Sequence, residues 1–378
     1  MQVKKQTDAI IALKSVIEKF REKEKELHCI FIDLEKAYDR VPREEVWHCL
    51  RVKAVPEEYI KVIQDMYNDS QTVIRTACGT TEPFRVKVGV HQGSALSPLL
   101  FAIVMDVLTD PVRRSAPWNM MYADDVVLLN ETQEEAEKEL NNWQKALEKR
   151  GLRVSRTKTE YLCVGEPATR PAIKMHTDDI PETDVFKYLG STIQQDGWCE
   201  KEIQKRIQAG WSNWRKVTGV MCDKRMSARL KGKVFKSVVR PAMMYGLETT
   251  PLTKKQEKDM EVAEMRMLRW SLGWTRKDKV RNEKVRRMTG VEELSVKTKE
   301  GRLRWFGHVK RRDVGYVGRQ VLELEIDGRR KRGRPKRKWM DLVKADMREL
   351  ELEEEDALDR NIWRCGIHYS IPANCRIC

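Results

Sequence analysis

The hydrophobic pattern of the first 165 residues alternates between helical and strand periods. Residues 7–26 place four apolar side chains on one stripe, which predicts an amphipathic helix. The next run, CIFID, is short and apolar and ends on Asp33, as a buried strand does. Two strand-like pieces, QTVIRTA and FRVKVG, follow. A further helix is expected to begin at Ser97 and to end near Asp110.

The stretch MYADDVVLL, residues 121–129, carries two adjacent aspartates inside an apolar run. In one continuous strand Asp124 and Asp125 would face opposite sides of a sheet. At a tight turn between NMMYA and VVLL they point the same way, and aspartate tolerates turns. After it, TQEEAEKELNNWQKALEKRG has a capping box, Thr132 with Glu135, and a helical apolar stripe, and EYLCVG reads as a strand.

The order of these elements is strand, helices, strand pair, helix and strand. This order is the split βαβ pattern of a ferredoxin-like sheet, with the extra strand-like pieces as an insertion. The fold class is therefore expected to be α+β. In such a sheet CIFID and the MYADDVVLL hairpin lie side by side at the centre, so we expect Asp33 close to Asp124 and Asp125.

The second half of the chain has a different character. Segments 200–222, 226–247 and 253–272 are predicted to be helices with basic faces that carry tryptophans. From about residue 276 the chain is strongly basic, and residues 329–338, RRKRGRPKRK, contain eight Arg or Lys in ten. An acidic patch, ELELEEEDALD, follows within a predicted closing helix.

The composition narrows the choice of partners. With 73 Lys and Arg against 58 Asp and Glu, the formal net charge is +15, which favours a polyanionic partner such as nucleic acid or an acidic membrane surface. Nine scattered cysteines, an odd number, indicate reduced thiols. No signal peptide and no apolar run of membrane-spanning length are visible. We therefore expect no membrane partner and a location in the nucleus, the cytoplasm or both; the oligomeric state is left open.

Three aspartates gathered on one sheet, without histidine or cysteine nearby, are hard oxygen ligands. Such ligands suit Mg²⁺ or Mn²⁺ and not zinc. Two such ions about 3.5–4 Å apart activate an attacking hydroxyl and stabilise the leaving oxygens in phosphoryl transfer. The alternative is an Asp–Asp turn that simply faces water.

Five blocks occur in the order found in reverse transcriptases of non-LTR retrotransposons: FIDLEKAYDRVP, VHQGSALSPLLFAIVMDVL, MYADDVVLL, RTKTEYLCVG and FKYLGSTI. The sequence resembles this family, most of all the LINE-like elements of the RTE type. The resemblance implies a polymerase palm and an RNA-directed DNA polymerase. Such an enzyme extends a DNA primer on an RNA template with dNTPs and Mg²⁺ (or Mn²⁺).

The resemblance also assigns roles to the acidic residues and to one lysine. Asp33 matches the first metal-binding aspartate of the palm, and Asp124 and Asp125 match the pair in the second catalytic block. Lys158 matches a lysine that is proposed, in such polymerases, to protonate the leaving pyrophosphate. An exposed lysine in a basic loop is the alternative for Lys158.

Other positions match blocks that contact the substrates. Tyr38 stands where the family keeps an aromatic ring that blocks a ribose 2′-OH, although a buried core tyrosine would look the same. Gln92 and Gly93 match the block that contacts the incoming nucleotide and the template, and the alternative for Gly93 is a plain turn glycine. The hairpin that holds the primer end is matched by Tyr188, Leu189 and Gly190, with an ordinary hydrophobic hairpin as the alternative.

The chain departs from the family pattern at its start. The upstream fingers region, with its basic residues for the triphosphate, is replaced by MQVKKQ, so the chain is expected to be an N-terminally truncated copy or a derived host gene. The predicted division is a fingers remnant or linking helix (1–28), a palm (29–195), a helical thumb-like region (196–275) and a basic C-terminal nucleic-acid-binding region (276–378). Without fingers, the phosphates lose cationic partners and positioning suffers.

The basic tail contains an Arg-Gly-Arg-Pro core that resembles an AT-hook. A narrow A·T minor groove favours inserted arginines, which makes A·T-rich DNA a candidate partner. The candidate contacts are Arg332, Arg334, Lys336 and Arg337. A nuclear-localisation signal or a phosphate clamp without sequence preference are the alternatives.

The end of the chain holds a cysteine and histidine set whose spacing fits no known zinc knuckle or finger. Its members are Cys365, His368, Cys375 and Cys378.

Three classes of function remain open. The leading hypothesis is a reverse transcriptase that carries out two-metal nucleotidyl transfer. The alternative is a catalytically inactive nucleic-acid-binding protein that keeps the palm as a scaffold. The third class is a structural or partner-binding protein with neither activity nor nucleic-acid affinity.

Overall fold

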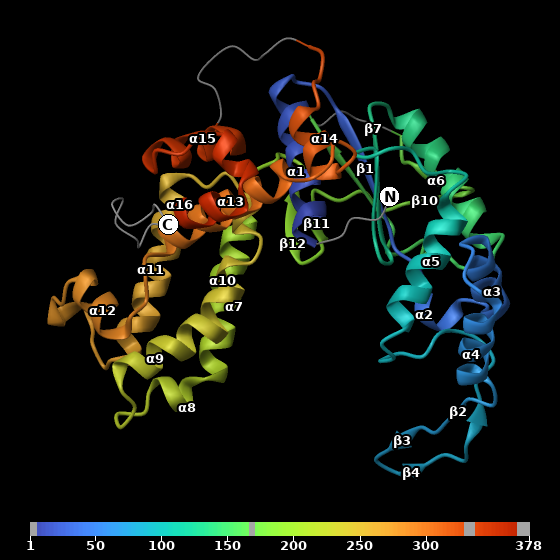
Figure 1. Ribbon diagram of the computed structural model, residues 1–378, viewed down its shortest axis with the longest axis horizontal. Helices are drawn as coiled ribbons and strands as arrows, with labels where there is room; N and C mark the ends of the chain where they lie inside the picture. The colour runs from blue at the N-terminus through green and yellow to red at the C-terminus, as the bar shows by residue number, and fades with distance from the viewer. Residues whose placement is uncertain (1–5, 166–170, 329–336, 369–378) are drawn as a thin grey trace. The chain divides into compact units, whose positions relative to one another are not determined.

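The computed structural model describes residues 6–165, 171–328 and 337–368, which divide into two compact units (Figure 1). The first unit holds Lys25–Asp184 and the residues up to Ala9, and the second holds Ile10–Glu24 and the chain from Val185 onward. This division does not test the four predicted regions, which stay predictions. Within the described part of the chain, no helix combines the length and the hydropathy that crossing a bilayer requires.

A four-stranded antiparallel sheet forms the centre of the first unit. Its strands are β1 (Leu27–Ile32), β6 (Asn119–Tyr122), β7 (Asp125–Asn130) and β8 (Glu160–Val164). The strand order is β6-β7-β1-β8. Numbered along the chain within this sheet, the order is 2-3-1-4, which is the ferredoxin-like arrangement that the sequence predicts. The prediction that CIFID lies beside the MYADDVVLL hairpin is confirmed.

Helices of the first unit pack against the face of this sheet that carries Ile30 and Ile32. They are α2 (Ala37–Arg40), α3 (Arg43–Val52), α4 (Glu57–Tyr67), α5 (Ser97–Thr109) and α6 (Gln133–Glu148). Helix α6 begins because the Thr132 hydroxyl accepts a hydrogen bond from the Glu135 backbone N–H, as an N-cap residue does. Its predicted apolar stripe is fully buried in the core of the unit, so the 3.6-residue period identified the packed face correctly.

The two strand-like pieces QTVIRTA and FRVKVG form far less sheet than their composition suggests. These pieces and the segment between them hold short strands of two residues each: β2 (Gln71–Thr72), β3 (Arg75–Thr76), β4 (Gly79–Thr80) and β5 (Phe84–Arg85). Strand β2 pairs with β5 and β3 with β4. All four are exposed to solvent, so their apolar residues have no core to pack against, and strand propensity alone does not extend the ladder. Another short pair in this unit is β9 (Lys174–Met175) with β10 (Asp178–Asp179).

The second unit is mainly helical and has one hairpin, β11 (Val185–Tyr188) with β12 (Ser191–Gln194). Helix α1 (Gln6–Glu22) contributes most of its residues to this unit. The longer helices are α7 (Glu200–Lys216), α9 (Ala228–Val234), α11 (Lys254–Ser271), α12 (Asn282–Thr289), α13 (Leu294–Lys310) and α15 (Trp339–Glu349). Shorter ones are α8 (Thr218–Met221), η1 (Phe235–Val239), α10 (Arg240–Met244), η2 (Leu247–Thr249), η3 (Arg276–Asp278), α14 (Val317–Glu323), η4 (Glu355–Leu358) and α16 (Arg360–Gly366). Two apolar clusters stabilise it, one around α7, α10 and α11 and one around α13, α15 and α16.

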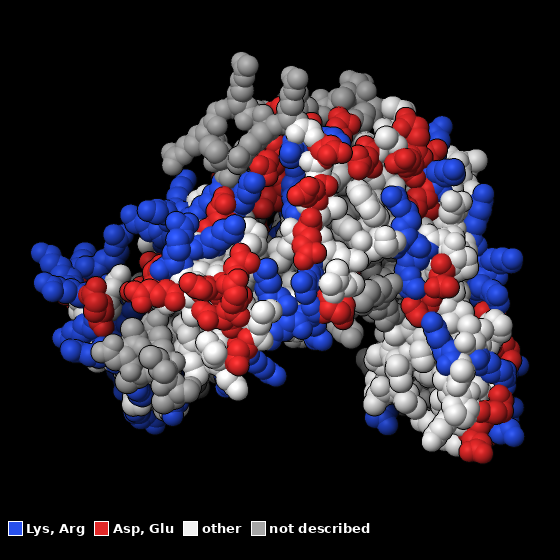
Figure 2. Space-filling model, turned by 45° about the horizontal axis from the view of Figure 1, so that its top comes forward, with Lys and Arg blue, Asp and Glu red and all other residues white. Residues whose placement is uncertain are grey.

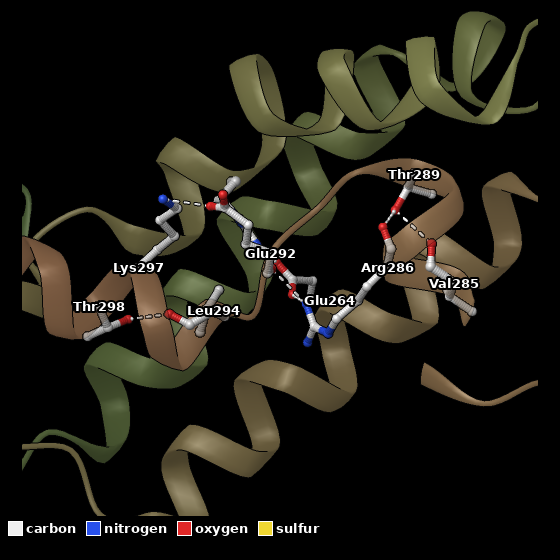
Figure 3. A network of polar contacts seen from close by, with 9 residues as sticks. Glu264, Val285, Arg286, Thr289, Glu292, Leu294, Lys297 and Thr298 are labelled. Atoms are coloured by element: carbon white, nitrogen blue, oxygen red, sulfur yellow. Dashed lines mark hydrogen bonds and ion pairs between the residues drawn. The ribbon is translucent and has the colours of Figure 1, made fainter. Parts of the chain in front are cut away.

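A buried ion network ties three helices of the second unit together. The carboxylate of Glu264 on α11 is fully buried and accepts hydrogen bonds from Arg240 on α10 at 2.7 and 3.0 Å. Its other oxygen accepts from Arg286 on α12 at 2.9 Å. Figure 3 shows Arg286 also reaching the backbone oxygen of Glu292, and Lys297 reaching the Glu292 carboxylate. One buried carboxylate thus neutralises the buried guanidinium group of Arg240 and the partly buried one of Arg286.

Replacing Glu264 by Gln is expected to destabilise the protein strongly, because it leaves Arg240 and Arg286 without a counter-charge. The expected loss is about 3–5 kcal/mol in the free energy of unfolding, measured by urea denaturation. The matched control is Asp259→Asn, an exposed carboxylate on the same helix, which should change stability by less than about 0.5 kcal/mol. Equal effects of the two substitutions would contradict this role of Glu264.

Candidate active site

The two adjacent aspartates lie at the turn between β6 and β7. Tyr122 pairs with Asp125, so Ala123 and Asp124 form a two-residue turn. Ala123 has a φ of 55°, a left-handed conformation that costs a residue with a Cβ roughly 1–2 kcal/mol. The tight turn predicted between NMMYA and VVLL is therefore confirmed, and the chain accepts local strain to make it.

The pairing of β1 with β7 brings Asp33 to the same end of the sheet. Ile32 pairs with Val126 in an antiparallel register, so the next positions along the two strands are Asp33 and Asp125. Residues directly opposite each other in an antiparallel pair have side chains on the same face, with Cβ atoms about 4.5–5.5 Å apart. The backbone of Asp33 is held on its other side, where its oxygen accepts from the Ser155 N–H at 2.8 Å.

The electrostatics of this end of the sheet show carboxylates that lack enough positive charge. Desolvation and, after it, the negative charges of Asp124 and Asp33 together raise the pKa of Asp125 to about 6. The pKa of Asp33 is also raised, first by burial and then by Asp124 and Glu35, while Lys158 lowers it. The site therefore favours a cation.

Lys158 is the nearest positive side chain to Asp33. Its Nζ lies 3.9 Å from Asp33 Oδ2, and the lysine side chain is 72% exposed. Oδ2 of Asp33 has almost no solvent exposure and makes no hydrogen bond. At 3.9 Å through a largely exposed side chain, this ion pair is weak. A buried carboxylate oxygen is thus left for a stronger partner.

The donor set at this end of the sheet fits a divalent ion. Carboxylate oxygens are the ligands that Mg²⁺ and Mn²⁺ prefer, and the orphaned Asp33 Oδ2 and the raised pKa values are what ligands show without their cation. The oxygens of the three aspartates do not all lie within 4.8 Å of one another. These carboxylates would hold divalent ions, which would supply the positive charge that the site lacks.

Tyr38 lies between the protein core and the acidic residues. Its ring stacks on Phe101 with the centroids 4.6 Å apart, and the side chain is only partly buried. Burial and, after it, the negative charge of Asp124 raise the pKa of the Tyr38 phenol, which places the ring near that carboxylate. Tyr38 thus has one face on the core and lies near Asp124, and its role toward a ribose 2′-OH stays a prediction.

A backbone contact that the sequence interpretation missed fixes the position of Tyr38. The Val90 backbone N–H donates to the backbone oxygen of Tyr38 at 2.8 Å. The Gly89 backbone N–H donates to the backbone oxygen of Val41 at 2.9 Å. Gly89 has a φ of 82°, and a Cβ built there would lie 2.7 Å from the Asp39 oxygen. Only glycine permits this approach. In the sequence, only the glycine at position 89 indicates that the backbone comes this close.

Gln92 and Gly93 follow this contact and are exposed. The Gln92 side chain donates to Asp39 Oδ1 at 2.7 Å, so it is oriented by the segment that carries Tyr38. Gly93 has a φ of 86°, and no atom lies within 4 Å of the position that a Cβ would take. A turn glycine and a glycine beside a ligand would both have this geometry. The substrate contacts assigned to both residues stay predictions.

The residues predicted to hold the primer end belong to the second unit, where they form the β11–β12 hairpin. Tyr188 is buried, and Leu189 and Gly190 make the turn with φ values of 46° and 78°. The Leu189 oxygen accepts from the Tyr245 hydroxyl at 2.6 Å. The hairpin is therefore braced, and its role toward a primer stays a prediction.

Of the tail residues proposed to contact DNA, Arg332, Arg334 and Lys336 lie outside the described residues. Arg337 is exposed and donates to the Leu252 backbone oxygen at 3.1 Å.

In the C-terminal cysteine set, His368 Nδ1 lies 3.9 Å from Glu300 Oε1, and Cys375 and Cys378 lie outside the described residues. Among the described residues, the cysteines form no disulfide with one another.

An antiparallel sheet of this strand order, with acidic residues gathered at the end of its central strands, defines a polymerase palm. Residues 2–193, just over half of the chain, match the family described as reverse transcriptase (RNA-dependent DNA polymerase). The chain belongs to this family and contains a reverse transcriptase domain. Reverse transcriptases act on an RNA template and generally use divalent metal ions.

Curated relatives come from non-LTR retrotransposons. The chain is 31% identical over 217 residues to the Pol polyprotein of the type-1 retrotransposable element R2 of Nasonia vitripennis, which covers 50% of this chain and 20% of that protein. It is 22% identical over 242 residues to the RNA-directed DNA polymerase from the mobile element jockey of Drosophila melanogaster, covering 60% and 26%. The chain thus spans less than a third of these two relatives, and its RTE type stays a prediction.

A solved structure of apo telomerase from Candida tropicalis is also similar, with a TM-score of 0.39 and 13% identity. The match covers 81% of this chain and 55% of that one.

The raised pKa of Asp125 predicts that the stability of the fold depends on pH, and that a divalent ion removes this dependence. Because its folded-state pKa of about 6 exceeds the usual 3.8, the proton stabilises the fold below pH 4, and that contribution disappears as the pH rises through 6. Carboxyl-carbon NMR titration should give a pKa of about 6 for Asp125 without divalent ions and a clearly lower pKa with saturating Mg²⁺. Asp106, paired with Lys53 and Arg113, should not respond to Mg²⁺. An Asp125 titration that Mg²⁺ leaves unmoved would contradict the metal assignment.

Proposed function

We propose that this protein is an RNA-directed DNA polymerase that extends a DNA 3′ end on an RNA template by nucleotidyl transfer from dNTPs. The observation that carries the proposal is the cross-strand register that sets Asp33 opposite Asp125, next to Asp124 in the turn. Five sequence blocks of the family and the match over residues 2–193 support it.

Asp33, Asp124 and Asp125 would hold Mg²⁺, or Mn²⁺, through their carboxylate oxygens. The bound ions supply activation of the primer 3′-hydroxyl and stabilisation of the oxygens on the phosphoryl group that is transferred. The aspartates themselves position the ions at the exposed end of the sheet. Lys158, which is exposed and lies 3.9 Å from Asp33, is proposed to give a proton to the leaving pyrophosphate.

The remaining partners follow from the same reaction. RNA template, DNA primer and dNTPs are the proposed substrates, with Gln92 and Gly93 at the nucleotide and Tyr188, Leu189 and Gly190 at the primer. The basic tail, from Arg332 to Arg337, is proposed to bind A·T-rich DNA. A location in the nucleus, the cytoplasm or both is part of the same proposal.

The second candidate function is nucleic-acid binding without catalysis. The excess of positive charge favours it independently of the aspartates, since 73 basic residues face 58 acidic ones. Figure 2 shows Lys and Arg over much of the visible surface, interspersed with Asp and Glu. This candidate predicts salt-sensitive RNA binding and no extension of a primer.

Replacing Asp124 by Ala is expected to abolish primer extension and to leave RNA binding intact. The loss should be at least about a hundredfold, because the substitution removes a ligand that acts in the transition state and not in template binding. The assay is extension of a DNA primer on a homopolymer RNA with Mg²⁺, beside a filter-binding measurement at several salt concentrations.

The matched control is Asp110→Asn, an exposed aspartate of the same unit that is paired with Arg113 and lies outside the acidic cluster. This variant should extend primers like the unchanged protein. Undiminished synthesis by Asp124→Ala would refute the assignment. Salt-sensitive binding without extension by the unchanged protein would favour the second candidate function.

Replacing Tyr38 by Ala is expected to relax the discrimination against ribonucleotides. The ring, held on Phe101 near Asp124, would exclude a 2′-hydroxyl by its volume. The rate of rNTP incorporation relative to dNTP should rise about tenfold or more in single-nucleotide extension. Tyr38→Phe keeps the ring and should keep the ratio. A ratio unchanged in Tyr38→Ala would show that the tyrosine serves only the core.

A further inference from the structure

A second group of ligand-type side chains lies at the opposite end of strand β1 from Asp33. Glu26, His28 and Cys163 each contribute one ligand atom, and the three atoms lie within 4.8 Å of one another. Among the described residues, no other group of His, Cys, Asp and Glu side chains comes this close together. Since His28 and Asp33 are five residues apart on an extended strand, the two sites are separated by about 17 Å. The aspartate chemistry does not involve this group.

The sheet itself assembles the group. His28 on β1 pairs directly with Cys163 on β8, so their side chains lie on the same face of the sheet. Both are buried, with 3% and 2% of their surface exposed, whereas the Glu26 side chain is 44% exposed. His28 Nε2 lies 3.7 Å from Glu26 Oε2. The group thus has two buried members and an open side.

A neighbouring tyrosine fixes the histidine ring. The Tyr161 hydroxyl lies 2.7 Å from His28 Nδ1, and the two rings are stacked nearly parallel. A histidine that ligates a metal commonly engages its other ring nitrogen in this way, because the contact sets both the tautomer and the orientation of the ring. Nδ1 is engaged, and Nε2 is the nitrogen directed at Glu26.

A glycine leaves room for the glutamate. Gly165 has a φ of 150°, and a Cβ built there would lie 3.1 Å from Glu26 Cγ. A larger residue would press on the glutamate stem and displace its carboxylate from His28. The end of β8 therefore supplies both the thiol and the space for the third member.

We propose that Glu26, His28 and Cys163 form a zinc site with an open fourth position for water. Thiolate and imidazole ligands favour zinc over Mg²⁺, in contrast to the all-oxygen set at the other end of the strand. Bonds of about 2.0–2.3 Å to O, N and S place tetrahedral ligand atoms about 3.3–3.7 Å apart, so the observed spacing needs only a modest closing. The open side at Glu26 gives the ion its entry path.

The test uses the full chain stripped of metal and titrated with Co²⁺, a spectroscopic substitute for zinc. We expect one equivalent to bind, with a thiolate-to-cobalt charge-transfer band and tetrahedral ligand-field bands, and zinc to displace it. Cys163→Ser should lose the charge-transfer band. Cys29→Ser, a buried cysteine one position from His28 on the opposite face of the sheet, should retain it.

Two further variants keep the test decisive. Glu26→Gln changes an exposed residue, so the protein should fold normally, measured by circular dichroism, and should bind zinc about tenfold or more weakly. A variant with Cys365, Cys375 and Cys378 replaced by Ser should bind as the unchanged protein does. A thiolate band that survives in Cys163→Ser, or its absence from the unchanged protein, would overturn the proposal.

Discussion

The backbone ladder between β1 and β7 determines where every acidic group of the site lies. Its register makes Asp33 the neighbour of Asp125, and the two-residue turn adds Asp124 beside them. A slip of one residue would turn one aspartate to the other face of the sheet, because side chains alternate. The slip is prevented by the apolar residues of both strands, which are buried throughout. The hydrophobic core thus sets the spacing of the charges.

The helical and strand periods were sufficient to predict the ferredoxin-like sheet, because each period has a physical cause that acts locally. The strands of the sheet, the α6 stripe and the helix from Ser97 follow from burial of one face, and their order limited the topology to the split βαβ pattern. The same reasoning overestimated the strands in residues 71–77 and 84–89, where most apolar residues are exposed. Periodicity reports which residues can be buried, and it does not report whether a core is there to bury them.

Some features of the site could not be predicted from the sequence, because they depend on the folded backbone. Ala123 has a strained left-handed backbone conformation, and an alanine side chain does not predict such a conformation. The Gly89 contact depends on the Asp39 backbone, 50 residues away in sequence, so only the folded chain reveals why glycine is needed there. The Asp33, Asp124 and Asp125 positions were predictable, whereas their raised pKa values arise from burial and from one another.

The positive charge of the chain is a poorer guide to nucleic-acid binding than its total suggests, because folding uses some of it internally. Arg240, Arg286 and Arg302 are largely buried in ion pairs with Glu264 and Asp346, and these guanidinium groups cannot reach a phosphate. Such pairs fix the packing of the helices, since leaving one partner unpaired is costly. Binding must therefore come from the exposed cations, and it should weaken with salt in proportion to the number of those that contact phosphates.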